Sequence, residues 1–193
     1  MRLLKTTLIA LGINFLALGT AQSQHTIPAG IIDELRQFTS AEIVLLSVEK
    51  ANKKTASYDQ ARIDELDSRW RSEREDYQQP LIVDLMSRQA SLYLLRQIAA
   101  SKGLLLDFFI TDLKGLNVAQ AMVTSDYWQG DEDKFLKTVP LGPDGLLISE
   151  PEQDADTGAE MVQISFSIVM KGKVIGMACV DFNLTEAKRR GLL

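Results

Sequence analysis

The sequence predicts an α+β domain in which a helical N-terminal segment packs on a single antiparallel sheet of about five strands. Two observations lead to this prediction. Apolar residues recur at helical spacing through much of residues 24–103. Residues 104–193 instead contain apolar and alternating runs around two tight turns, at 112–115 and 171–173, which is typical of β-hairpins. With 193 residues, of which 46% are hydrophobic, the chain is long enough for one domain with a sizeable core.

Residues 1–23 are expected to be a cleaved export signal. Arg2 and Lys5 precede an apolar run at 8–18, and small residues suited to cleavage follow it. The alternative is an uncleaved membrane anchor, but the run is shorter than the roughly 20 residues that a spanning helix needs. The mature chain is therefore expected to be periplasmic and not membrane-spanning, with 24–103 and 104–193 as two segments of one domain.

The helical segment is expected to divide into several helices. Apolar spacing predicts a first helix from about Pro28, and a capping-box pattern at 39–42 predicts a break and a restart that runs to about Lys53. One continuous long helix is the alternative. A second capping box at Ser57 predicts a highly charged helix to about Tyr77, whose charges are most simply a solvated face.

The next helix, from Pro80 to about Gly103, has the broadest apolar stripe, so we expect it to pack across the sheet. The predicted strands cover residues 104–112, 115–122, 146–149, 161–170 and 174–184. Residues 133–139 are expected to form a short helix, and the acidic stretch 150–157 is expected to be an exposed loop.

Composition argues against several kinds of chemistry. The formal net charge is −5 and no basic stripe is present, so nucleic acid is a poor partner. His25 is the only histidine, which argues against Ser–His or Cys–His catalysis and against zinc ligation. Cys179, the single cysteine, is interpreted as a small buried hydrophobic residue. No cofactor is expected and the chain is predicted not to be an enzyme; a two-carboxylate hydrolase is the weakest alternative.

One polar stretch has no explanation in core packing. Residues 124–132 crowd two aromatics, an amide and several carboxylates without apolar periodicity. Alternation along the later strands also places Gln163, Ser165 and Ser167 on one face of 161–170 and Asp181 on the mixed face of 174–184. These groups are candidates for a binding site; the alternative is that the mixed faces simply meet solvent.

Three stretches together resemble the Cache, or PDC, extracytoplasmic sensor domains. They are FFITDLKGLNVA at 108–119, TSDYWQGDEDKF at 124–135 and VQISFSIVMKGKVIGMACVDFNL at 162–184. The resemblance covers roughly residues 40–184 and is nearest to the small, free-standing periplasmic members of that family. It implies a PAS-like sheet and a small-molecule-binding sensor that presents its ligand state to a membrane-bound signalling protein.

In many Cache domains the ligand lies between the sheet and the segment after the second strand, so the resemblance implies a roof and a floor. The implied roof contains Ser125, Asp126, Tyr127, Trp128 and Asp131, and the floor contains Gln163, Ser165 and Asp181. Aromatics would give shape and cation–π attraction and a carboxylate would pair with an amine, so the expected ligand is a small polar molecule such as an amine or amino acid.

Two alternatives to this site remain open. The oxygen-bearing side chains Asp126, Asp131, Glu132 and Asp133 suggest a calcium site as a lesser hypothesis, although their spacing is not that of the EF-hand loop. The alternative function is a non-catalytic envelope interaction or structural protein that binds no ligand.

Overall fold

The structure, a computed structural model, describes residues 27–193, so the predicted export signal lies outside the described residues. The helices are α1 Ala29–Thr39, α2 Glu42–Thr55, α3 Gln60–Arg74, α4 Pro80–Met86, α5 Gln89–Ser101, α6 Asp133–Leu136 and α7 Leu184–Arg189, with a 3-10 helix η1 at Val139–Leu141. The strands are β1 Leu105–Thr111, β2 Asn117–Gln120, β3 Leu146–Ile148, β4 Glu152–Gln153, β5 Glu160–Met170 and β6 Lys173–Asn183. The predicted α+β class is confirmed.

The strands form one sheet in the order β2-β1-β6-β5-β3, with β4 paired to β5 outside this path. Every pair is antiparallel, which confirms the predicted single antiparallel sheet. Strand β4 was not predicted, because 150–157 was expected to be a loop. The two residues of β4 are exposed as expected, yet they pair with the start of β5.

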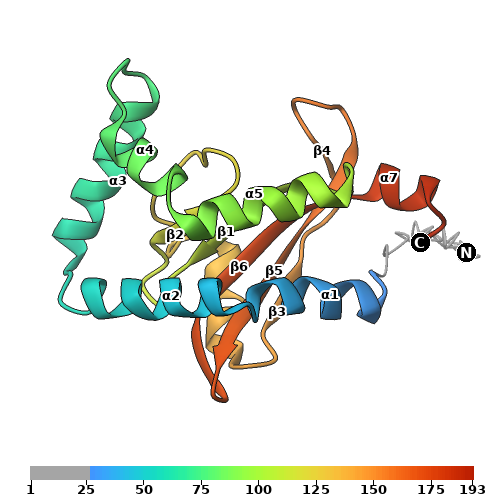
Figure 1. Cartoon of the computed structure of the whole chain (residues 1–193), viewed down its shortest axis with the longest axis horizontal. Helices are drawn as coiled ribbons and strands as arrows, with labels where there is room; N and C mark the ends of the chain where they lie inside the picture. The colour runs from blue at the N-terminus through green and yellow to red at the C-terminus, as the bar shows by residue number, and fades with distance from the viewer. Residues whose placement is uncertain (1–26) are drawn as a thin grey trace, which may run out of the picture.

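Helices α1, α2 and α5 cover one face of the sheet, while α3 and α4 extend beyond one end of it (Figure 1). The main core lies under the covering helices. It joins Val48 of α2 and Leu94 of α5 to Ile110, Phe166 and Val180 of the strands, all of them fully buried. The face of β5 and β6 that alternation predicts to be apolar is therefore the face that packs on helices.

The opposite face carries a second, smaller cluster beneath α6 and η1. It consists of Phe109, Phe135, Met177 and Cys179, with Val139 packed against it. The helix-covered face and this face, which we call the far face, differ in polarity, because the far face also contains the charged residues described below.

The break between the first two helices is confirmed, but its predicted capping box is wrong. The Thr39 hydroxyl donates to the carbonyl of Arg36 at 2.9 Å, and the N-cap of α2 is Ala41, which has no side-chain acceptor. The third helix is capped by Asp59 and not by Ser57: the Asp59 carboxylate accepts from the backbone N–H of Arg62 at 2.9 Å.

The helix predicted from Pro80 is two helices that meet at a corner. Arg88, with φ −64° and ψ 146°, is the extended N-cap of α5. Its guanidinium donates to the carbonyl of Val118 at 3.1 Å and to the carboxylate of Asp84 at 2.6 Å, which ties the corner to β2. Helix α5 still packs across β1 and β2, as the sequence predicts. Within residues 27–193, no helix has both the length and the apolar character needed to cross a membrane.

Candidate functional site

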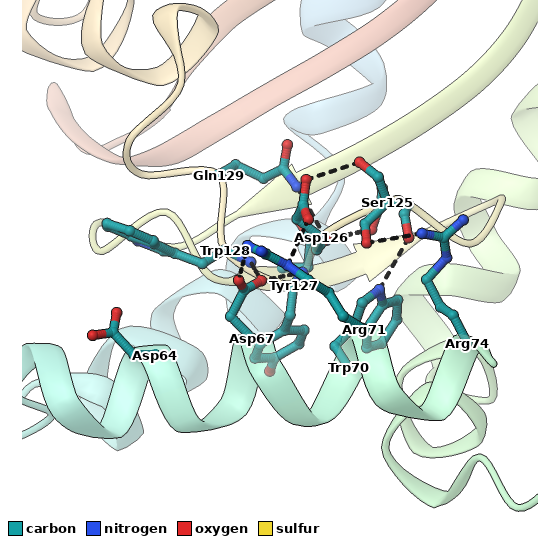
Figure 2. A network of polar contacts seen from close by, with 12 residues as sticks. Asp64, Asp67, Trp70, Arg71, Arg74, Ser125, Asp126, Tyr127, Trp128 and Gln129 are labelled. Atoms are coloured by element: carbon teal, nitrogen blue, oxygen red, sulfur yellow. Dashed lines mark hydrogen bonds and ion pairs between the residues drawn. The ribbon is translucent and has the colours of Figure 1, made fainter. Parts of the chain in front are cut away.

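Helix α3 holds the polar stretch 124–128 through a set of contacts that we call the α3 clamp (Figure 2). At its centre is Asp67, which is only 5% exposed. One carboxylate oxygen of Asp67 accepts from the backbone N–H groups of Tyr127 at 2.9 Å and Trp128 at 3.1 Å. Arg71 binds the other oxygen and also pairs with Asp126 at 3.0 Å. The carboxylate therefore has donors on both oxygens.

Two further side chains of α3 extend the clamp. The indole N–H of Trp70, which is fully buried, donates to the carbonyl of Thr124 at 3.0 Å. Arg74 donates to the carbonyl of Ser125 at 3.2 Å, and the rings of Trp70 and Tyr127 lie 5.4 Å apart. Residues 67, 70, 71 and 74 follow helical spacing, so one face of α3 presents all of them to the same stretch. The charges on this face are thus not simply solvated, contrary to the sequence interpretation.

Trp128 is held from its other side by the β1–β2 turn. Its indole N–H donates to the carbonyl of Lys114 at 2.7 Å, and its backbone pairs with Leu116. Gly130 lies directly against the same indole. A Cβ at Gly130 would be only 2.3 Å from the Trp128 indole nitrogen, so a larger residue would disturb this contact. Trp128 is therefore an anchor between the β1–β2 turn and α3.

A cavity of about 560 Å³ lies between α2, α3, the α4–α5 corner and β2. We call it the helix-side cavity. Its lining comprises Ser47, Lys50, Ala51, Lys54, Thr55, Tyr58, Arg62, Leu66, Leu81, Asp84, Arg88, Gln89, Asp112, Leu116, Asn117, Val118 and Tyr127. Cations thus outnumber carboxylates in the lining, while leucine, valine and tyrosine side chains supply its apolar surface.

The four cations of this cavity differ in how they are paired. Arg88 is bound to Asp84 and to a carbonyl, and Arg62 pairs with Glu65 at 2.5 Å and lies 5.8 Å from the Tyr58 ring centroid. Lys50 and Lys54 form no ion pair with any residue of the described range 27–193. They are one helical turn apart on α2, so they present two uncompensated charges to the same opening.

The carboxylate of Asp112, also in the lining, is committed to the β1–β2 turn. It accepts from the Thr55 hydroxyl at 2.7 Å and from the backbone N–H groups of Lys114 at 2.8 Å and Leu116 at 3.0 Å. Burial nevertheless raises the pKa of Asp112 above its usual value. Asp112 shapes the wall of the cavity and has little capacity left for a ligand.

On the far face, a group of titratable residues lies under α6. Asp107 and Asp181 are partners in the β1–β6 register, and Gln163 donates to Asp181 at 3.0 Å. Burial raises the pKa of Asp107 to about 7, and burial also raises the pKa of Asp181. The ammonium of Lys134 pairs with Glu132 at 2.9 Å and lies 5.4 Å from the centroid of the Phe109 ring.

Cys179 lies in the same group and is fully buried, which confirms its interpretation as a core residue. Burial raises the pKa of its thiol to about 12. Its neighbour in the β5–β6 register is Ser165, 1% exposed, whose hydroxyl has no hydrogen-bond partner within the described residues.

The eight site residues predicted from the resemblance fall into separate places. Tyr127 is the only one of them in the lining of the helix-side cavity. Asp126 and Trp128 belong to the α3 clamp, while Ser125 and Asp131 are exposed. Gln163, Ser165 and Asp181 share the far face. The structure thus brings the predicted floor together, but it attaches residues 125–128 of the predicted roof to α3 and leaves Asp131 apart from them.

The hypothesis of a calcium site is wrong for the described range 27–193, where no group of three or more His, Cys, Asp or Glu residues could hold a metal ion. The carboxylates concerned are engaged with cations instead. Asp126 pairs with Arg71, Glu132 with Lys134, and Asp133 with Lys137 at 2.6 Å.

The cations of the cavity and the buried carboxylate of Asp107 were not predicted as site residues from the sequence. The spacing of Lys50 and Lys54 was visible in the sequence, but nothing there distinguishes a lysine beside a cavity from one in open solvent. Asp107 sits in an otherwise apolar predicted strand, and this was the signal that could have identified it.

No protein-family model and no curated protein sequence matches the chain. Among solved structures, the chain is similar to the ligand-binding domain of the Campylobacter jejuni chemoreceptor Tlp3 in complex with 4-methylisoleucine (TM-score 0.40, 11% identity, 81% of this chain and 65% of that chain). It is also similar to the ligand-binding domain of the Pseudomonas aeruginosa PAO1 amino acid chemoreceptor PctC in complex with GABA (0.42, 15%, 83% and 63%). A third is the sensor domain of the V. cholerae histidine kinase DctB (0.34, 13%, 83% and 57%).

The chain covers less than two thirds of each of these domains. Two of them are ligand-binding domains of chemoreceptors, and the third is the sensor domain of a histidine kinase. What they bind is a property of those proteins, and a site in this chain depends on its own residues.

Proposed function

We propose that this chain is a periplasmic sensor module that binds a small molecule in the helix-side cavity and presents its ligand state to a membrane-bound signalling protein. The observation that supports this function is the cavity itself. Its volume of about 560 Å³ falls within the range of about 300–1,000 Å³ that is usual for small-molecule sites. No catalytic role is proposed.

The charges of the cavity favour a ligand with a carboxylate group. Lys50 and Lys54 lack partners among the described residues, so an anion would gain two charge-assisted hydrogen bonds without breaking an existing ion pair. Leu66, Leu116 and Val118 would contact the apolar part of the same molecule. A small organic acid or an amino acid meets both requirements.

The residues predicted from the resemblance take different roles in this proposal. Tyr127 contributes to the cavity wall, and Asp126 and Trp128 support it because they fix its backbone to α3. Gln163, Ser165 and Asp181 are proposed as a second polar site on the far face, where Asp181 would pair with an amine. Ser125 and Asp131 have no role in either site.

Paired ligands that differ only in charge give the sharpest test. Thermal unfolding should be followed with succinate, phenylacetate and the common amino acids, each beside its neutral amide. A ligand at about one hundred times its Kd stabilises by roughly 2.7 kcal/mol, which corresponds to a rise in Tm of about 5–10 °C. We expect an acid to give this rise and its amide to give much less.

Two variants locate the binding. Lys54→Gln should weaken the affinity by about fivefold, the effect of roughly 1 kcal/mol, while Lys53→Gln, one residue away and paired with Glu49, should not. Leu66→Trp should fill the cavity and abolish binding. If a ligand still binds Leu66→Trp with unchanged affinity, the helix-side cavity is not its site. If Asp181→Asn then weakens it, the far-face site is the correct one.

The alternative, an envelope interaction protein without a ligand, predicts a different result. No member of the panel would then stabilise the chain, and Lys54→Gln and Leu66→Trp would change only the intrinsic Tm. Turnover of any panel member would instead favour a hydrolase.

A further inference from the structure

A second, smaller cavity lies between the last turn of α1, the loop before β3 and the end of β5. Its volume is about 190 Å³, and it is lined by Arg36, Thr39, Ser40, Pro143, Ser167 and Val169. We call it the α1–β5 cavity. At about 30 Å³ of liquid volume per water molecule, it is large enough for a small ion with some water. None of its lining side chains is acidic.

The guanidinium of Arg36 is incompletely bound at this cavity. Its Nε is buried and has no hydrogen-bond partner in the described part of the chain. One terminal nitrogen donates to the carbonyl of Asp144 at 3.4 Å, a long contact. Arg36 forms no ion pair within residues 27–193, so its charge is not neutralised by the protein there.

A buried hydroxyl without a partner lies in the same lining. Ser167 is 4% exposed, and its Oγ accepts or donates no hydrogen bond within the described residues, although its backbone N–H donates to the carbonyl of Gly145 at 3.1 Å. A buried polar group left without a hydrogen-bond partner destabilises the fold. Two such groups beside one cavity, one of them cationic, therefore indicate a missing acceptor.

The other hydroxyls of the lining are already engaged. Thr39 donates to the carbonyl of Arg36 at 2.9 Å, and Ser40 donates to the carbonyl of Gln37 at 2.8 Å. The free donors are thus Arg36 Nε and Ser167 Oγ, and both require an acceptor. A register shift lies between Ile168 and Val169, the latter of which also lines the cavity, and such irregularities often occur at binding sites.

We propose that the α1–β5 cavity binds a small oxyanion, such as a phosphate, a sulfate or a carboxylate group, between the Arg36 guanidinium and the Ser167 hydroxyl. The planar guanidinium matches the geometry of these groups. The anion bridges the end of α1 to β5, beside the break between α1 and α2. This site is separate from the helix-side cavity, so it stands or falls independently of the sensor function.

The test is a titration of the intact protein with sodium phosphate, sulfate or acetate at low millimolar concentration, with chloride holding the ionic strength constant. We expect a saturable rise in Tm of about 3–5 °C at ten times the Kd. The anion that binds most tightly identifies the chemical class of the ligand. Tighter binding of phosphate or sulfate would indicate a tetrahedral ion, and tighter binding of acetate would indicate a carboxylate.

Arg36→Gln should abolish the rise, and Ser167→Ala should weaken the affinity by about fivefold to tenfold. The matched control is Arg96→Gln, an exposed arginine of α5 that forms no ion pair in the described chain and should bind as the parent does. Should Arg36→Gln not fold, Ser167→Ala alone decides the question. The proposal is overturned if no saturable rise occurs, if the rise is equal in Arg36→Gln or Ser167→Ala and the parent, or if it is unsaturated and common to all variants, as a general salt effect would be.

Discussion

Two buried carboxylates in this molecule, Asp67 and Asp107, each accept two backbone hydrogen bonds but differ in the charges around them. In the α3 clamp, Asp67 is buried with two backbone donors and Arg71. On the far face, Asp107 is buried beside another carboxylate, Asp181, and also has two backbone donors, from Phe108 at 2.6 Å and Met122 at 3.2 Å. What differs is the charge nearby: Asp67 has a cation in direct contact, and Asp107 does not.

The difference shows that hydrogen bonds alone do not decide how a buried carboxylate behaves. Burial raises the pKa of Asp107 to about 7 in spite of its two donors, and the charge of Asp181 acts in the same direction. The far face therefore changes its charge near neutral pH, at Asp107.

The largest effect is expected from Asp67→Ala. It leaves the N–H groups of Tyr127 and Trp128 without their acceptor and Arg71 without a partner on α3, so the free energy of unfolding should fall by about 3–5 kcal/mol. Urea denaturation measures this. Asp64→Ala is the control, because Asp64 is exposed on the same helix (Figure 2) and should change stability by less than about 0.5 kcal/mol. Equal effects of the two variants would show that the clamp has no special role.

The second largest effect is a pH dependence of the free energy of unfolding, which the substitution Asp107→Asn should remove. The folded-state pKa of about 7 exceeds the unfolded value of about 3.9, so the folded chain binds this proton more tightly. The contribution of this proton to the free energy of unfolding is fully present below about pH 4 and is lost as the pH rises through 7. Between pH 5 and pH 8 the free energy of unfolding of the parent protein should fall by on the order of 3 kcal/mol more than that of Asp107→Asn. Parallel pH profiles for both proteins would contradict the assignment.

A smaller effect is expected from Lys134→Met. The cation lowers the pKa of both Asp107 and Asp181, so its removal should move the pH-dependent loss of stability to higher pH. At pH 8 the variant should also be less stable by about 1 kcal/mol, since it loses its contact with the Phe109 ring. Lys137→Met removes an exposed lysine from the segment just after α6 and should leave the pH profile unchanged. A profile for Lys134→Met that matches this control would place the lysine outside the titrating group.

The smallest expected signal comes from Cys179. With burial raising its pKa to about 12, only about one thiol in ten thousand is ionised at pH 8. Iodoacetamide should therefore leave the native protein unmodified by mass spectrometry and label it fully in guanidinium. Rapid labelling of the native chain would mean that the far face opens to solvent.

Much of the fold follows from local patterns. The turn at 171–173 and the alternation of β5 and β6 predict both the hairpin and the face that packs on helices, because register and side-chain direction are fixed together in a strand. The burial of Cys179 follows in the same way. The corner at Arg88 could not be predicted, since it depends on the carbonyl of Val118, 30 residues away in sequence.

The candidate sites were harder to predict for a related reason. The composition of 124–132 marks it as unusual, but its partners Asp67 and Arg71 lie on a highly charged helix whose apolar stripe is narrow, so the sequence does not show which of its charges face this stretch. The helix-side cavity takes its walls from four helices and two strand ends, so no single stretch encodes it. Sequence pattern identifies unusual residues here, while their partners depend on the assembled fold.

The residues that meet in the α3 clamp are far apart in sequence, so they are synthesised at different times. Asp67 and Tyr127 are 60 residues apart, so α3 is complete long before its docking partner exists. At about 5–20 residues per second, that interval lasts roughly 3–12 s. Throughout it the indole of Trp70 has neither Thr124 nor Tyr127 to bury it. The indole of Trp70 can therefore reach its folded environment only after residues 124–127 have been made.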